Sequence, residues 1–303
     1  MNTDTSALSG SRIDAFEVTL DQDHPGLHDL LYRRRRDEIA RLALDHVPGT
    51  AVPTVAYTAQ EEATWKTVWS HLRSALEETA CAAVWERMQA WAPWERGIPQ
   101  LAELSEGHRL GSGPGSGPTA LLGPLYGTGF RFEPVHGLLS SQDFFASLKR
   151  SVFRSTQYLR HGSRPLYTPE PDLVHELVGH ASTFSIPGVP ELSVAFGEAA
   201  ASADEATLLR LERLYWYTVE FGLVRENGEP RAFGAGLLSS AGELARIPNV
   251  ELRPFSDEAV QAQAYQTDRP QSVLFIAESL DQLLEETADA VMRLGAERKV
   301  SRA

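Results

Sequence analysis

One stretch decides how this chain is interpreted: Pro171-Asp172-Leu173-Val174-His175-Glu176-Leu177-Val178-Gly179-His180. It holds two histidines that stand five positions apart. A later stretch, Tyr215-Trp216-Tyr217-Thr218-Val219-Glu220, adds a carboxylate. Two imidazoles and one carboxylate are the ligand set of a mononuclear non-haem iron(II) site with open coordination positions. We therefore predict a metal site made of His175, His180 and Glu220, with oxygen activation favoured over hydrolysis.

Zinc is the competing metal. A zinc protease helix carries His-Glu-x-x-His, whose histidines share one helix face and whose glutamate is the general base. Here the spacing is one residue longer, and on a regular helix of ~3.6 residues per turn His175 and His180 point roughly 140° apart. Both reach one metal only if the helix ends or distorts between them, and Gly179 would permit a break. The spacing argues against a zinc hydrolase, which remains an alternative, as does a purely structural His–Glu network.

The residues around this stretch follow a longer ordered pattern. Two of its segments are Gln157-Tyr158-Leu159-Arg160-His161-Gly162-Ser163 and Tyr167-Thr168-Pro169-Glu170-Pro171-Asp172. The others are residues 23–26, 32–36, 57–65, 98–101, 128–132, 134–141 and 234–240. With these segments the chain resembles the pterin-dependent aromatic amino acid hydroxylases. Because so many segments match in order, chance agreement is not a serious alternative.

The resemblance implies a mainly α fold, a single catalytic domain of packed helices with a few short β-strands. It implies Fe(II) and a tetrahydropterin (tetrahydrobiopterin or similar) as cofactors and O2 as co-substrate, with the reduced pterin supplying two electrons beside the metal. The implied reaction is hydroxylation of the ring of a free aromatic amino acid, and L-phenylalanine to tyrosine is the leading expectation. Within the same class, the alternative is meta-hydroxylation of phenylalanine, or hydroxylation of tryptophan or tyrosine. An inactive binding protein that retains the fold is the alternative from a different class.

The resemblance also implies where the pterin binds. Phe144 matches the family's stacking ring, and Arg154 stands where several members have a histidine near the pterin. The backbone and side-chain contacts of the family to its pterin correspond to Gly137, Leu139 and Ser141. Glu176, which follows the first metal ligand without being one, and Tyr215 complete the expected catalytic region.

The substrate carboxylate is expected to meet Arg160, since a guanidinium can give a carboxylate two parallel hydrogen bonds. By resemblance, Asp172 orients this arginine, and Thr168 and Ser239 add polar contacts to the substrate.

The ring pocket is marked by Trp216. Phenylalanine and tyrosine hydroxylases of the family carry tryptophan there, whereas tryptophan hydroxylases carry phenylalanine. Thr267 aligns with a position where a small apolar residue favours phenylalanine and an acidic residue favours tyrosine, so it supports neither substrate.

Composition narrows the class of protein. The 303 residues are 42% hydrophobic and 23% charged, which is typical of a globular protein with a substantial core. A net charge of -13 argues against nucleic acid or an anionic membrane as partner. The single cysteine, Cys81, excludes an intrachain disulfide, fits a reducing cytosol, and is expected to be a buried thiol. With no signal peptide and no apolar run of ~20 residues, a cytoplasmic location is expected.

The chain is expected to consist of a flexible tail over residues 1–20 and a catalytic domain over residues 21–303. A Gly/Pro/Ser-rich insertion near residues 106–127 is predicted to be a flexible linker, with a mobile lid beside the active site as the alternative. Neither the N-terminal regulatory domain nor the C-terminal tetramerisation helix that animal members of the family carry is expected. The expectation is a bare catalytic domain of the bacterial type, and a monomer.

Apolar periodicity predicts helices over residues 28–46, 61–91, 143–159, 204–221 and 280–294, and short strands over 130–135 and 231–234. The expected core stripe of the first helix is Leu30, Leu31, Ile39, Leu42 and Leu44. The expected core stripe of the second region is Trp65, Val68, Leu72, Leu76, Val84, Trp85 and Met88.

Overall fold

The structure is a computed structural model that describes residues 24–90, 94–104, 128–166, 168, 170–267 and 269–301. The expected tail over residues 1–20 and the expected insertion near 106–127 lie outside the described residues. The α-helices are α1 (Pro25–His28), α2 (Leu30–Asp45), α3 (Ala59–Thr79), α4 (Ala82–Ala90), α6 (Ser141–Leu148), α7 (Ser182–Phe184), α8 (Val189–Ala200), α9 (Glu205–Tyr215), α10 (Ala235–Leu238), α11 (Ala241–Leu244), α12 (Asp257–Ala262) and α13 (Leu280–Ser301). Two π-helices, η2 (His175–Ala181) and η3 (Trp216–Glu220), and a 3-10 turn, η4 (Ile247–Asn249), complete the helical part. The predicted mainly α fold is confirmed.

Two small sheets accompany the helices. Strands β1 (Arg131–Pro134) and β2 (Val152–Ser155) form a parallel pair. The second sheet has the order β4-β3-β6-β5, built from β3 (Leu223–Glu226), β4 (Glu229–Ala232), β5 (Glu251–Pro254) and β6 (Val273–Ala277). Strand β6 is buried along its whole length and pairs in parallel with both neighbours, as expected for an inner strand.

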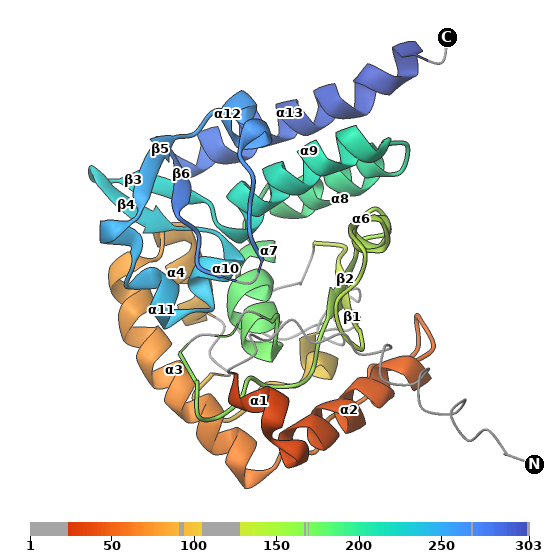
Figure 1. The fold of residues 1–303 in the computed structure, drawn as a ribbon, viewed down its shortest axis with the longest axis vertical. Coiled ribbons are helices and arrows are strands. Elements are labelled where there is room, and N and C mark those ends of the chain that lie inside the picture. The colour runs from red at the N-terminus through yellow and green to blue at the C-terminus, as the bar shows by residue number, and fades with distance from the viewer. Residues whose placement is uncertain are drawn as a thin grey trace, which may run out of the picture.

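The segment that carries the histidines lies in the interior. Figure 1 shows it in green in the middle of the molecule, with α3 along one side and α8 and α9 on another. In η2, all residues but His175 are buried, and α10 packs against it. The packing around η2 therefore restricts the movement of the two histidines that it carries.

The predicted region 61–91 forms two helices, α3 and α4. A capping box begins α3, because the Thr58 hydroxyl accepts from the Glu61 backbone N–H while the Glu61 carboxylate accepts from the Thr58 N–H. The chain leaves the helix at Ala80, and the Cys81 N–H donates to the Ala232 carbonyl of β4 at 2.9 Å. The predicted burial of Cys81 is confirmed, and the predicted core stripe is buried except for Trp85, which is partly buried.

The prediction of one helix over residues 143–159 is wrong in its second half. Helix α6 ends at Leu148, a turn follows in which Ser151 adopts a positive φ of 54°, and the chain then forms strand β2. Val152 and Phe153 are of the β-branched and aromatic types that favour strands, and pairing with β1 outweighs the helical periodicity.

The predicted core stripe of α2 is also largely wrong. Leu30, Leu31 and Leu44 are 64%, 77% and 54% exposed. The helix buries Ile39, as predicted, and it also buries Arg36, because the Arg36 guanidinium forms a buried ion pair with Glu170 and lies 4.5 Å from the ring centroid of Tyr158. A buried charge is tolerated where it is paired and hydrogen-bonded.

None of the described helices carries an apolar stretch long enough to cross a lipid bilayer.

Candidate metal centre and active site

The two histidines meet because their helix is a π-helix. A π-helix forms hydrogen bonds between residues five positions apart, so residues with that spacing lie one above the other. The ring centroids of His175 and His180 are 4.7 Å apart and their Nε2 atoms are 3.0 Å apart. The expected distortion is thus present, but the expected break at Gly179 is not. Gly179 lies within η2, where an added Cβ would fall 2.7 Å from the Ala235 carbonyl oxygen, so its role is close packing against α10.

Glu220 is the last residue of the second π-helix, η3. Its carboxylate oxygens lie 3.1 Å from His180 Nε2 and 3.5 Å from His175 Nε2. Ligand atoms of the three residues all lie within 4.8 Å of one another, and within the described part of the chain this is the one cluster of three or more metal-ligating side chains. The structure therefore brings together all three residues that the sequence nominated.

The electrostatics of this cluster suit a metal. Burial lowers the pKa of His175 to about 4, although the Glu220 carboxylate works in the opposite direction. Burial raises the pKa of Glu220, but the two imidazoles more than offset it, and the net shift is downward. A neutral imidazole and an ionised carboxylate are the forms that bind metals. The Ser239 hydroxyl lies 3.2 Å from His175 Nδ1 and holds the ring with Nε2 toward the other ligands, as partners of metal-bound histidines do.

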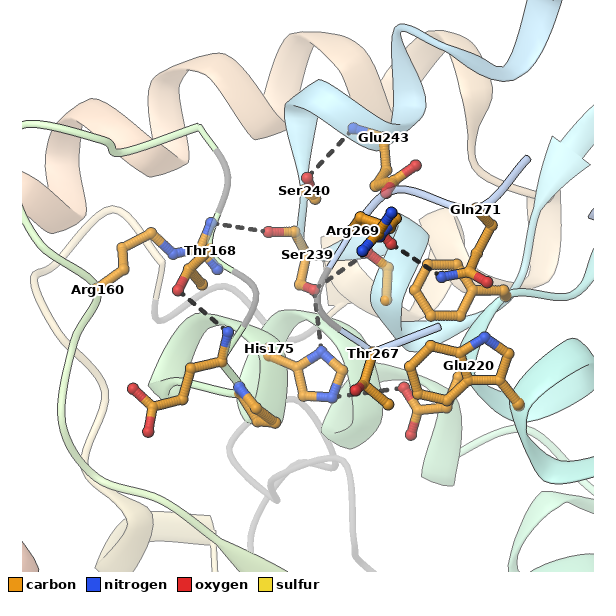
Figure 2. Close-up of a pocket in the computed structure, with 15 residues that line it drawn as sticks. Arg160, Thr168, His175, Glu220, Ser239, Ser240, Glu243, Thr267, Arg269 and Gln271 are labelled. Atoms are coloured by element: carbon orange, nitrogen blue, oxygen red, sulfur yellow. Dashed lines mark hydrogen bonds and ion pairs between the residues drawn. The ribbon is translucent and has the colours of Figure 1, made fainter. Parts of the chain in front are cut away.

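Two cavities meet at this cluster. The first, of about 140 Å³, contains Arg160, Ser239 and Glu243, and we call it the polar cavity (Figure 2). The second, of about 240 Å³, contains most of the expected pterin residues, and we call it the aromatic cavity. The residues that line both cavities are Pro171, His175, Trp216, Glu220 and Thr267. A metal held by the three ligands would thus face two compartments at once.

Arg160 is fixed more tightly than the sequence suggested. Its Nε and one terminal nitrogen donate to the two Asp172 carboxylate oxygens at 2.9 and 2.8 Å. The other terminal nitrogen donates to the Ser239 carbonyl at 3.1 Å and to the Pro165 carbonyl at 3.4 Å. The side chains of Arg160 and Asp172 are only 2% and 1% exposed. The two parallel hydrogen bonds expected for the substrate therefore go to Asp172. A substrate carboxylate in the polar cavity would meet the remaining outer edge of the guanidinium, near Thr168, which also lines that cavity.

The aromatic cavity fits a flat ring. Phe144 forms one wall and is braced edge-on by Tyr215 at 5.4 Å and by Phe153 at 5.9 Å. A Cβ added to Gly137 would meet nothing within 4 Å, so the chain leaves open space beside its backbone at this wall. The other expected pterin contacts, Leu139 and Ser141, line the same cavity.

Glu176 and Tyr215 also face the aromatic cavity, and both are buried. Glu176 accepts hydrogen bonds from the backbone N–H and the hydroxyl of Thr156, both at 3.2 Å. Burial nevertheless raises the pKa of Glu176 well above its usual range, which favours a protonated carboxyl. Among the described residues, the Tyr215 hydroxyl has no hydrogen-bond partner.

Arg154 lines the aromatic cavity, but its guanidinium is anchored. It forms an ion pair at 3.1 Å with Glu133, its direct partner across the β1–β2 ladder. Glu133 is buried and also accepts from Arg131 Nε at 2.8 Å. This pairing could not be foreseen while residues 143–159 were expected to be a helix.

The cavity wall at Trp216, where the substrate ring is expected, is a stack of aromatic side chains. Trp216 lies parallel to Tyr265 at 4.7 Å and packs against Phe221 at 4.8 Å. Sequence reasoning missed Tyr265 and Phe221, and it also missed Glu243 in the polar cavity. Glu243 stands in a Ser-x-x-Glu pattern, which signals a helix N-terminus rather than a site.

The comparisons with known proteins agree with this geometry. The family model described as biopterin-dependent aromatic amino acid hydroxylase matches residues 5–301. Tyrosine 3-monooxygenase of Homo sapiens is 41% identical over 276 residues, covering 88% of this chain and 49% of that protein. Phenylalanine-4-hydroxylase of Bos taurus is 38% identical over 277 residues, covering 89% and 58%. The chain spans about half the length of these curated relatives.

Solved structures show the same fold. Phenylalanine hydroxylase of Chromobacterium violaceum with bound oxidised Fe(III) has a TM-score of 0.70 at 26% identity, covering 86% of this chain and 92% of that one. Phenylalanine hydroxylase of Legionella pneumophila has a TM-score of 0.68 at 27% identity, covering 83% and 96%. The chain belongs to the biopterin-dependent aromatic amino acid hydroxylases.

Proposed function

We propose that this protein is an iron(II)- and tetrahydropterin-dependent monooxygenase that hydroxylates the ring of a free aromatic amino acid, converting L-phenylalanine to tyrosine. The observation that carries the proposal is the position of His175, His180 and Glu220 at the junction of two cavities. One cavity offers a fixed guanidinium to an amino acid carboxylate, and the other offers an aromatic wall to a flat cofactor.

Each compartment has a distinct task. His175, His180 and Glu220 would hold iron, and iron with the reduced pterin supplies the electrons that activate O2. In the polar cavity, the outer edge of Arg160 binds the substrate carboxylate, with Thr168 and Ser239 beside it. Asp172 is a positioning residue, because it fixes the orientation of that guanidinium.

Trp216 positions the substrate ring, since it belongs to both cavities and is held by its aromatic neighbours. In the aromatic cavity, Phe144 stacks on the pterin while the walls at Gly137, Leu139 and Ser141 follow its edge. Arg154 adds a cation at this cavity.

Two further residues of the aromatic cavity are assigned catalytic roles. A protonated Glu176 can donate a hydrogen bond to a pterin acceptor, and Tyr215 presents a hydroxyl close to the metal ligands. Both sit away from bulk water, where such hydrogen bonds are strongest.

Tyrosine is the second candidate substrate. The curated relatives of this chain include tyrosine 3-monooxygenases, and Thr267, whose hydroxyl can hydrogen-bond to a phenol, lines the polar cavity. Meta-hydroxylation of phenylalanine uses the same residues and differs only in how the ring is placed. The complete ligand set and the buried Arg160 speak against an inactive binding protein.

The test is oxygen consumption by anaerobically iron-loaded protein. Uptake should require both a tetrahydropterin and an aromatic amino acid, and iron should support it where zinc does not. Products from phenylalanine, tyrosine and tryptophan are then identified by mass and ring position. Oxygen uptake independent of the pterin, or activity with zinc alone, would refute the proposal, whereas a meta-hydroxylated product would change only the ring position.

A further inference from the structure

A free amino acid carries an ammonium group as well as a carboxylate, and the ammonium group also needs a partner. Moving an isolated charge from water into a cavity is costly unless an opposite charge meets it. In the polar cavity the acidic side chains among the described residues are Glu170, Glu220 and Glu243. Asp172 is already bound on both oxygens by Arg160.

Two of these carboxylates are committed elsewhere. Glu220 faces the two histidines as a candidate metal ligand. Glu170 is buried, and its Oε1 accepts from both Arg36 and the Tyr158 hydroxyl. A substrate ammonium would have to compete with an existing ion at either position.

Glu243 differs from both. It is 5% exposed, and among the described residues the partner of its carboxylate is Arg246, which reaches Oε2 at 3.1 Å from a side chain that is itself 42% exposed. Among the described residues Oε1 has no hydrogen-bond partner, and Glu243 lines the polar cavity together with Arg160 and Arg269. In Figure 2, Glu243 stands at the end of the cavity opposite His175 and Glu220. The Glu243 carboxylate is therefore buried, is paired with a cation at one of its two oxygens, and lies on the wall of the polar cavity.

Two adjacent residues, Ser239 and Ser240, connect Glu243 to Arg160, the residue proposed to bind the substrate carboxylate. The Ser239 carbonyl accepts from Arg160, and the hydroxyl of the next residue, Ser240, accepts from the Glu243 N–H at 3.2 Å as the cap of α11. Adjacent residues thus hold the Arg160 guanidinium and the backbone of Glu243 beside a cavity of only about 140 Å³. An α-carboxylate and an α-ammonium share one carbon atom, and two opposite charges placed around one small cavity match that arrangement.

We propose that Glu243 binds the α-ammonium group of the substrate while Arg160 binds its α-carboxylate, so that a free α-amino group becomes a requirement for binding. The inference rests on the proposed function and adds to it a residue that determines specificity. Deaminated or N-acylated aromatic acids would leave the Glu243 carboxylate without a partner, and a site with an unpaired buried polar group rejects such analogues.

The test is direct binding rather than turnover. Protein loaded with cobalt(II), without pterin, is titrated by calorimetry with L-phenylalanine and with 3-phenylpropanoate, which lacks the amino group. Wild type should bind phenylalanine roughly 10- to 150-fold more tightly, the range that a hydrogen bond between charged groups provides. Glu243→Gln should lose most of this preference by weakening phenylalanine binding, with 3-phenylpropanoate affinity unchanged within about threefold.

Two matched variants separate ligand binding from a structural role. Arg246→Gln removes the ion-pair partner of Glu243 but keeps the carboxylate, and it should retain the preference for phenylalanine. Glu243→Asp keeps the charge one methylene farther back, and it should retain part of the preference. If Arg246→Gln reproduces Glu243→Gln, or if both ligands weaken equally in Glu243→Gln, the role is structural and the inference is overturned.

The outcomes also separate the inference from the proposed function. If wild type binds neither ligand, the assignment of the polar cavity to an aromatic amino acid fails. If wild type binds phenylalanine and Glu243→Gln binds it equally well, only the role of Glu243 fails. Binding of 3-phenylpropanoate by each variant shows that its cavity is intact.

Discussion

His175 and His180 are five positions apart in the chain, yet their Nε2 atoms lie 3.0 Å apart. On a regular α-helix this spacing would turn the two rings away from each other. The π-helical segment brings them onto one face, and a second π-helix places Glu220 opposite them. Single-turn π-helices are often found at functional sites. In this chain two of them build one site.

The first prediction concerns the ligands. Replacing His175, His180 or Glu220 by alanine should reduce iron affinity by more than the ~10–100-fold that loss of an outer partner of a metal ligand causes. Hydroxylation should disappear while the far-ultraviolet circular dichroism stays that of a folded protein. Iron content after anaerobic reconstitution and gel filtration is the measurement, with the exposed His71→Ala as control. Near-normal iron content in any one variant would remove that residue from the ligand set.

The second prediction concerns Arg160. Arg160→Lys replaces a planar fork by a point charge, which weakens the substrate clamp and leaves the buried Asp172 poorly paired. The KM for the amino acid should rise roughly 10- to 150-fold, as expected from ~1.5–3 kcal/mol for a hydrogen bond between charged groups. The free energy of unfolding should also fall, by less than the ~3–5 kcal/mol that removing one charge of a buried ion pair costs, since lysine keeps the charge but not the two parallel hydrogen bonds to Asp172. KM is measured at saturating pterin and iron, and stability by urea titration.

The contrasting result would be a large loss of stability with an unchanged KM. Arg160 would then be structural only, and the carboxylate clamp would lie elsewhere in the polar cavity.

The ligand residues of this site could be predicted from the sequence, but their geometry could not. His175, His180 and Glu220 follow from residue type and order, whereas the π-helix and the close packing of Gly179 within it against Ala235 are revealed by no local pattern. The strand β2 was hidden because its apolar residues also fit a helical period. Its register with β1 is what places Glu133 beside Arg154.

Residues that come from distant loops were missed for a related reason. Tyr265 stacks on Trp216, and Gln271 lines the polar cavity. Both residues lie in the loop before the inner strand β6, and this loop brings them to the site. Nothing in their local sequence indicates this. Arg36 was missed in the same way, since its burial depends on Glu170 far along the chain.

The third prediction concerns Cys81. Burial raises the pKa of this thiol to about 12, so at pH 8 the native protein holds it almost entirely as the unreactive thiol. Native protein should react with a disulfide reagent far more slowly than protein in denaturant, where the thiol regains a pKa near ~8.5. Both reactions should accelerate between pH 7 and 9, because the thiolate fraction rises with pH in each state, but the native reaction should stay far slower than the denatured one at every pH. Rapid reaction of one thiol per native chain at pH 8 would show that the thiol is accessible after all.

The last prediction concerns substrate choice and rests on Trp216. Its indole forms a wall shared by both cavities and contacts Tyr265 and Phe221, and we expect the space beside it to hold a single six-membered ring. Overpacking typically costs ~1–3 kcal/mol, so phenylalanine should exceed tryptophan in kcat/KM by roughly tenfold to a hundredfold, each ~1.4 kcal/mol being a factor of ten. Trp216→Phe should enlarge the pocket and narrow that preference, whereas Trp85→Phe in α4 should leave it unchanged. Competition of the two amino acids, with products separated by mass, measures the ratio for each variant. Equal or better use of tryptophan by the wild type would overturn phenylalanine as the substrate, and it would leave the proposed iron and pterin sites standing.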